Sequence, residues 1–160
     1  MATVAIVMGS KSDMVSLKGA FETLHAFGVD FEVRVISAHR TPDAAADFAK
    51  NAEKNGTKAI ICAAGMAAHL AGVIAAHTIV PVIGIPMACE PFNGFDALLS
   101  TVQMPGGIPV ATVAINGSEN AALLAAQMIA LSDDELAQKL LDMREDMHQS
   151  VLKKDAALNV

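Results

Sequence analysis

The sequence contains no tryptophan, no tyrosine and only two cysteines among its 160 residues. Hydrophobic residues make up 53% of the chain, and most of them are Ala, Val, Ile, Leu and Met, which suit close packing of helices. Cys62 lies in an apolar run and Cys89 in an expected loop, so they do not indicate a disulfide framework. Nothing in the sequence suggests a partner that would activate Cys89 as a nucleophile. This cysteine usage favours a reducing, cytoplasmic location.

Clusters of basic residues are also absent. The formal net charge is −6, and no run of Lys or Arg could neutralise several phosphates at once, which argues against a nucleic-acid partner. A small anionic ligand remains open because it needs only a few local donors. His, Cys and acidic residues do not stand at metal-ligand spacing, so we expect no metal site.

Long uninterrupted apolar segments are missing as well. The longest apolar stretch, residues 59–86, is interrupted at five positions: Gly65, His69, Gly72, His77 and Pro81. It therefore cannot run as one membrane span, which needs about 20 apolar residues. Residues 1–8 are too short for a signal peptide and lack its basic flank. We expect a soluble protein that does not enter a membrane.

Short apolar runs rich in β-branched residues alternate with segments of helical periodicity. The five runs are residues 3–8, 31–37, 58–63, 81–85 and 110–115. Successive βα units with strands that are apolar on both faces predict a parallel sheet covered by helices on both sides. We therefore expect residues 1–160 to form a single α/β domain, a three-layer doubly wound sheet of the flavodoxin-like type.

The expected helices lie between these runs, at residues 13–27, 42–54, 66–77, 96–102 and 118–131. Gly28 should end the first of them, and Pro42 stands at a first-turn position of the second. Ser132 opens a capping-box sequence with Glu135, which predicts a last, charged helix extending past Leu152. Because this helix lies outside the alternation, we expect residues 132–160 to pack on a neighbouring subunit or across the domain.

The first candidate binding segment is the turn Met8-Gly9-Ser10-Lys11-Ser12-Asp13, because ligands of such sheets bind beyond the carboxyl ends of the strands. Gly9 permits a tight turn, and the hydroxyl groups of Ser10 and Ser12, together with free helix amides, can bind an anion. The segment has neither Walker nor dinucleotide-binding spacing. The alternative, in which Ser12 or Asp13 only caps the helix, is equally compatible with this turn.

The second segment, Ser37-Ala38-His39-Arg40-Thr41-Pro42, places a hydroxyl, an imidazole and a guanidinium at the end of one strand. His39 can exchange a proton with a substrate in either direction, because histidine is the side chain whose unperturbed pKa lies nearest neutrality. Arg40 offers a planar fork of donors to a phosphate or a carboxylate. The structural alternative is a histidine at a helix start followed by a solvated arginine.

The third segment follows the third strand and is rich in small residues. Gly65, Ala67 and Ala68 would let a helix start approach a ligand closely, with Leu70 behind them. His69 is expected one turn into this helix, where it could touch the ligand. A lone histidine on an apolar helix is, however, more often a packing residue.

Together these turns resemble the N5-carboxyaminoimidazole ribonucleotide mutases of bacterial de novo purine biosynthesis, in their class I type. Nearly the whole chain takes part, and the order and spacing of the segments make the set specific. The matching segments are Met8-Gly9-Ser10-Lys11-Ser12-Asp13, Ser37-Ala38-His39-Arg40-Thr41-Pro42, Ala67-Ala68-His69-Leu70, Leu98-Leu99-Ser100 with Val102-Gln103-Met104-Pro105, and Pro109-Val110-Ala111-Thr112-Val113-Ala114-Ile115.

The resemblance implies an isomerase that moves a carboxylate from the exocyclic nitrogen of an aminoimidazole ribonucleotide to ring carbon 4, on the route to IMP. It implies decarboxylation, followed by attack of the ring carbon on the trapped carbon dioxide, with no cofactor and no metal. His39 matches the general acid and base of the family. One histidine can serve both steps, since the first asks for a proton and the second returns it.

The resemblance also assigns binding roles. Ser10 and Asp13 are expected to hold ribose or phosphate groups and Arg40 the phosphate, assisted by Ser12 and Ser37. A tight pocket would keep carbon dioxide from escaping between the steps. Its expected small apolar walls are Gly65, Ala67, Ala68 and Leu70. Members of the family form octamers with sites shared between subunits, so the resemblance further implies a homo-octamer, which would explain the outlying last helix.

Two positions depart from the family pattern: Met66 stands where a second glycine is usual, and Ala71 where proline is usual. Both lie beside the expected carbon dioxide pocket. Met66 either points away and leaves catalysis intact, or narrows the site and alters substrate choice. Two other functions stay open: a direct carboxylase of aminoimidazole ribonucleotide that uses free carbon dioxide, and a non-catalytic phosphometabolite-binding protein. The latter would leave His39 unexplained.

Overall fold

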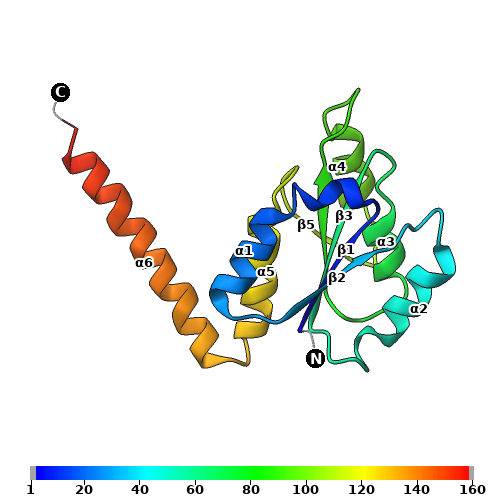
Figure 1. The fold of residues 1–160 in the computed structure, drawn as a ribbon, viewed down its shortest axis with the longest axis horizontal. Helices are drawn as coiled ribbons and strands as arrows, with labels where there is room; N and C mark the ends of the chain where they lie inside the picture. Colours follow the sequence, from blue (N-terminus) through cyan, green and yellow to red (C-terminus); the bar gives the residue numbers. More distant parts are fainter. Residues whose placement is uncertain (1–2, 159–160) are drawn as a thin grey trace.

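Five parallel strands form one sheet in the order β2-β1-β3-β4-β5 in the computed structural model, which describes residues 3–158 (Figure 1). This order is that of a flavodoxin-like doubly wound sheet, so the predicted fold class is confirmed. The strands are β1 (Val4–Met8), β2 (Phe31–Val35), β3 (Ala59–Gly65), β4 (Val82–Met87) and β5 (Ala111–Thr112).

The helices cover both faces of the sheet. The helices α1 and α5 pack together on one face, whereas α2, α3 and α4 lie on the other (Figure 1). Their bounds are α1 (Lys18–Phe27), α2 (Pro42–Ala52), α3 (Leu70–Ala75), α4 (Phe95–Val102), α5 (Ser118–Ala130) and α6 (Asp134–Ala156), with a short 3-10 helix, η1, at Lys11–Met14.

The central strands separate two buried clusters, because successive side chains of a strand point to opposite faces. In β1, Ile6 and Met8 join the cluster under α1 and α5, while Val7 joins the one under α2 and α3. All three side chains are fully buried. Burial of each such side chain stabilises the fold by roughly 1.5–3 kcal/mol. The well-packed sheet therefore fixes the positions of the loops that follow its strands.

The edge strand β2 departs from the expected pattern. Val33 and Val35 are 37% and 57% exposed, so the prediction that the strands are covered on both faces is wrong here. Strand register places Val33 on the same face as Ile6, the face of α1. From that helix, Phe21 stacks on Phe31 with ring centroids 5.8 Å apart. Beyond this contact, the carboxyl half of β2 is exposed on the face of α1.

One helix begins later than predicted, and one strand is shorter. The helix expected from residue 13 is instead η1 followed by α1, which begins at Lys18 and ends at Gly28 as predicted. Of the run 110–115 only Ala111–Thr112 forms the strand β5, although the Val113 N–H still donates to the Gly84 carbonyl of β4 at 3.1 Å. The chain then turns at Asn116, whose φ is +57°. The side-chain oxygen of Asn116 accepts a hydrogen bond from the backbone N–H of Ala88 at 2.9 Å, which fixes this turn.

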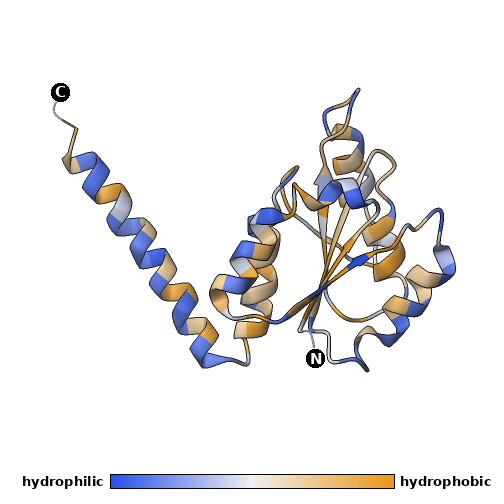
Figure 2. Ribbon diagram, in the orientation of Figure 1, coloured by the Kyte–Doolittle hydropathy of each residue, from blue (hydrophilic) through white to orange (hydrophobic). Residues whose placement is uncertain are grey.

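The last helix, α6, projects away from the sheet (Figures 1 and 2). Its N-cap is Asp133, whose side chain accepts a hydrogen bond from the Leu136 N–H at 3.0 Å, and not Ser132 as the capping-box pattern predicted. Ser132 instead donates to the Ile129 carbonyl at the end of α5. Only Leu136 and Leu140 of α6 are buried. None of the helices within residues 3–158 combines the length and apolar character needed to cross a bilayer.

Candidate active site

The turn after β1 carries a cluster of polar groups. Ser10 caps η1: its hydroxyl accepts from the Ser12 N–H at 3.3 Å, and its own N–H donates to the Asp13 carboxylate at 3.3 Å. The Ser12 hydroxyl donates to the Ser10 hydroxyl at 2.9 Å. The capping alternative considered from sequence is thus realised, but by Ser10 with Asp13. Capping does not exclude binding, since these groups also line a cavity.

The turn after β2 is tied to the turn after β1 by Arg40. Its guanidinium donates from Nη2 to the Gly9 carbonyl at 3.2 Å and from Nε to the Ser37 hydroxyl at 3.4 Å. The same hydroxyl accepts from the Arg40 backbone N–H at 3.1 Å, and Thr41 closes the turn by hydrogen bonding to Ser37. Arg40 has five N–H donors, so this anchoring leaves others for an anionic ligand.

The turn after β3 bends sharply at Met66, which has a left-handed φ of +56°. The N–H groups of Ala68 and His69 hydrogen bond to the carbonyls of Met66 and Ala67 at 2.9 Å. The helix expected from residue 66 therefore begins only at Leu70, and His69 is its N-cap residue. The prediction that His69 lies one turn inside the helix is wrong, and its side chain stands at the helix entrance.

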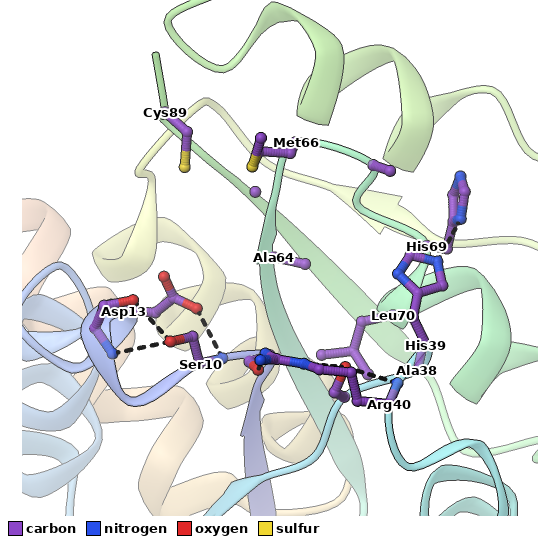
Figure 3. Close-up of a pocket in the computed structure, with 15 residues that line it drawn as sticks. Ser10, Asp13, Ala38, His39, Arg40, Ala64, Met66, His69, Leu70 and Cys89 are labelled. Atoms are coloured by element: carbon purple, nitrogen blue, oxygen red, sulfur yellow. Dashed lines mark hydrogen bonds between the residues drawn. The ribbon is translucent and has the colours of Figure 1, made fainter. Parts of the chain in front are cut away.

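This sharp turn brings the two histidines together. The Nε2 atom of His39 lies 2.8 Å from Nδ1 of His69, with the rings nearly perpendicular at 88° (Figure 3). A hydrogen bond between two imidazoles holds one proton, so one of these nitrogens donates while the other accepts. Both side chains are exposed in the single chain, and His39 therefore has a fixed partner without being sealed from a ligand.

A cavity of about 410 Å³ lies between these turns, at the carboxyl ends of β1, β2 and β3. This volume suits a small-molecule ligand. Of the eleven residues that the sequence assigned to the site, the cavity is lined by all except Ala68, which is buried beneath the turn. Those that line it are Ser10, Ser12, Asp13, Ser37, His39, Arg40, Gly65, Ala67, His69 and Leu70.

The cavity has further lining residues that the sequence analysis did not assign to the site: Gly9, Ala38, Ala64, Met66 and Cys89. Cys89 reaches it from the loop after β4, and its sulfur lies 2.5 Å from where a Cβ on Gly65 would be. Glycine is therefore required at position 65 for this approach. Met66 was noted only as a departure from a family pattern. The sequence does indicate Cys89 in one way: it lies just beyond the fourth strand, and ligands of such sheets bind beyond the carboxyl ends of the strands.

Burial perturbs two ionisable groups, Asp13 in the cavity wall and Cys62 inside β3. Partial burial raises the pKa of Asp13, and the hydrogen bond from the Ser10 N–H opposes this effect. A ligand hydroxyl that donates to Asp13 would recover part of the lost solvation. Burial also raises the pKa of the Cys62 thiol, which leaves Cys62 protonated and inert at neutral pH. Within residues 3–158, no three His, Cys, Asp or Glu side chains gather as a metal-binding group.

Comparisons with known proteins agree with this arrangement. A family model described as AIR carboxylase matches residues 3–150. The N5-carboxyaminoimidazole ribonucleotide mutase of Escherichia coli (strain K12) is 53% identical over 154 residues, covering 95% of this chain and 91% of that protein. The enzyme of the same name from Bacillus subtilis (strain 168) is 49% identical over 157 residues, covering 97% of each.

The fold comparison gives the same answer. The crystal structure of Treponema denticola PurE matches with a TM-score of 0.89 and 32% identity, covering 98% of both chains. The family suggested by the turns after the strands is thereby confirmed. Because the family model spans nearly the whole chain and the relatives share about half of their residues with it, the chain belongs to the AIR carboxylase family.

Proposed function

We propose that this protein is an N5-carboxyaminoimidazole ribonucleotide mutase, which forms 4-carboxy-5-aminoimidazole ribonucleotide in purine biosynthesis. The observation that carries the proposal is one cavity that combines anion donors with a hydrogen-bonded histidine pair. The names of relatives about 50% identical over most of the chain support it. The two aminoimidazole carboxylates are isomers, so the reaction consumes no oxidant, reductant or second substrate.

The phosphate of the substrate binds Arg40 in this proposal, with Ser10, Ser12 and Ser37 as further donors. Arg40 is already held by the Gly9 carbonyl and the Ser37 hydroxyl, so little side-chain entropy is lost when its remaining N–H groups meet an anion. The carboxylate of Asp13 only accepts hydrogen bonds when ionised. It therefore suits the ribose hydroxyls better than the phosphate.

His39 is the proposed acid and base. As the bond between the exocyclic nitrogen and the carboxyl carbon breaks, carbon dioxide leaves and His39 delivers a proton to that nitrogen. Ring carbon 4 then attacks the carbon dioxide, forming the new carbon–carbon bond. Loss of the proton from carbon 4 restores the aromatic ring and returns the proton to His39.

His69 is a positioning residue for His39. If Nε2–H of His39 donates to Nδ1 of His69 throughout the cycle, only Nδ1 of His39 gains and loses the catalytic proton. The ring orientation then stays the same in both steps. Gly65, Ala67 and Leu70 supply the apolar wall on this side of the cavity, while Ala68 supports the turn from beneath and does not touch the ligand.

We further propose a homo-oligomer, an octamer by resemblance, located in the cytoplasm, in which α6 packs on a neighbouring subunit. A groove between α5 and α6 is lined by the apolar side chains of Leu123, Leu124, Met143 and Met147. Leu141, Met147 and Val151 on α6 are 60–63% exposed. Apolar surface of this kind is typical of an interface.

The oligomeric state is tested by size-exclusion chromatography with multi-angle light scattering, which measures the mass of the particle. We expect a mass several times 16.6 kDa for the full chain. A Leu141→Glu, Val151→Glu double variant should lower it, because two charges then replace apolar contacts. As a control, Ser150→Glu adds charge at an exposed polar position of the same helix, one turn before Lys154. A monomeric full chain, or an unchanged mass of the double variant, would contradict the proposed role of α6.

The activity is tested with freshly prepared N5-carboxyaminoimidazole ribonucleotide in the absence of added bicarbonate. We expect fast formation of the carbon-carboxylated product, and little product from aminoimidazole ribonucleotide at low bicarbonate. A direct carboxylase, the activity suggested by the family description, would show the reverse preference. No product from either compound, with nucleotide binding retained, would instead indicate a phosphometabolite-binding protein.

A further inference from the structure

Met66 is the one residue of the cavity wall that adopts a left-handed backbone conformation without being glycine. Asn93 and Asn116, the other such residues in the described chain, carry a short polar side chain that tolerates this conformation. Met66 has no such group, and its N–H and carbonyl form no compensating side-chain hydrogen bond among residues 3–158. Its backbone is therefore strained, and glycine would fit the turn better.

The side chain of Met66 lines the cavity and is exposed. It is 57% exposed, so burial in the core does not explain why the strained residue is kept. Figure 3 shows Met66 and Cys89 along one edge of the cavity, with Arg40 along the opposite edge. A substrate whose phosphate binds Arg40 would extend its ring toward residues 64–67. Of the two large apolar side chains that line the cavity, Leu70 is buried and Met66 is exposed.

We propose that the Met66 side chain closes over the bound aminoimidazole and retains carbon dioxide between the two chemical steps. The inference rests on the proposed mutase function. It assigns to Met66 the retention of the carbon dioxide that is released from the substrate. Methionine suits the task, because its unbranched thioether adapts to a ligand surface. The residue forms no bond with the substrate: it acts by excluding water and by blocking the exit while the nitrogen–carbon bond is broken and the carbon–carbon bond is not yet made.

Three substitutions separate the side chain from the backbone strain. Met66→Leu keeps an apolar side chain of similar volume, Met66→Ala keeps the left-handed strain but removes the side chain, and Met66→Gly removes both. We expect Met66→Gly to unfold a few degrees higher than the wild type in differential scanning fluorimetry. Met66→Ala should unfold close to the wild-type temperature, since its backbone is strained in the same way.

Retention of carbon dioxide is measured with substrate labelled with ¹³C at the migrating carboxylate. The reaction runs in unlabelled bicarbonate with carbonic anhydrase, so that escaped carbon dioxide is diluted before it can return. Mass spectrometry of the product then gives the fraction of label retained. We expect the wild type and Met66→Leu to retain most of the label. Met66→Ala and Met66→Gly should lose at least threefold more of it.

The outcomes distinguish this inference from the proposed function. If the wild type forms product and all three variants retain the label equally, Met66 does not retain carbon dioxide and the inference is overturned. The same holds if Met66→Ala loses label only together with a lower oligomer mass, because Met66 would then be a subunit contact. If the wild type forms no product from the labelled mutase substrate, the proposed function fails first.

Discussion

Replacing His39 with Asn is expected to lower kcat for the carboxylate migration by about 10²- to 10⁴-fold, the usual contribution of a general acid and base. Asparagine is close to histidine in size and polarity but cannot deliver and recover a proton near neutral pH. The nucleotide should still bind with a dissociation constant within a few-fold of the wild type, because Arg40 and Ser10 are untouched. Steady-state kinetics and isothermal titration calorimetry measure the two quantities.

The matched control for His39→Asn is His25→Asn, which changes an exposed histidine of α1 outside the cavity lining. It should leave both kcat and binding unchanged. Retained turnover in His39→Asn would remove the acid and base role from His39. Loss of nucleotide binding in the same variant would instead make His39 a binding residue, and the chemistry would then need another proton donor in the cavity.

Replacing Arg40 with Ala is expected to weaken nucleotide binding by about 10- to 100-fold, since hydrogen bonds to charged groups contribute roughly 1.5–3 kcal/mol each. The loss should come from two sources. The phosphate loses its donors, and the link from the Arg40 side chain to the Gly9 carbonyl, which joins the turns after β1 and β2, is gone. Calorimetry with aminoimidazole ribonucleotide measures the dissociation constant.

Two companion variants sharpen this result. Arg34→Ala removes the same charge from β2, where Arg34 pairs with Glu32 and lies over Phe48 outside the cavity. It should leave binding unchanged and so control for net charge. Arg40→Lys keeps the charge without the planar fork, so we expect intermediate affinity. An unchanged dissociation constant in Arg40→Ala would remove Arg40 from the phosphate site.

The fold could be predicted because its signals are local and repeat along the chain. The runs that became β1, β3 and β4 are apolar on both faces, and this pattern depends only on the burial of parallel strands. The helix expected from residue 66 was wrong for a reason that lies outside local sequence. Met66-Ala67-Ala68 has good helix formers, yet Met66 takes φ +56° and delays α3 to Leu70.

The candidate site was predictable as a list of residues but not as a set of contacts. His39 and Arg40 stand out because polar, ionisable side chains follow an apolar strand directly. The hydrogen bond between His39 and His69 joins turns 30 residues apart, and it depends on the sharp bend at Met66. Cys89 enters the cavity because Gly65 has no side chain to exclude it. Such contacts follow from the folded geometry, which no single segment encodes.

The parallel sheet also determines where a tag or a sensor surface can be attached to the protein. Since all five strands run the same way, β1 begins, at Val4, at the edge of the sheet opposite the cavity (Figure 1). The helix α6 is 23 residues long and therefore extends about 35 Å from Asp134 to Ala156. Attachment of a tag or a sensor surface ahead of β1 should therefore leave both the cavity and the helix α6 accessible.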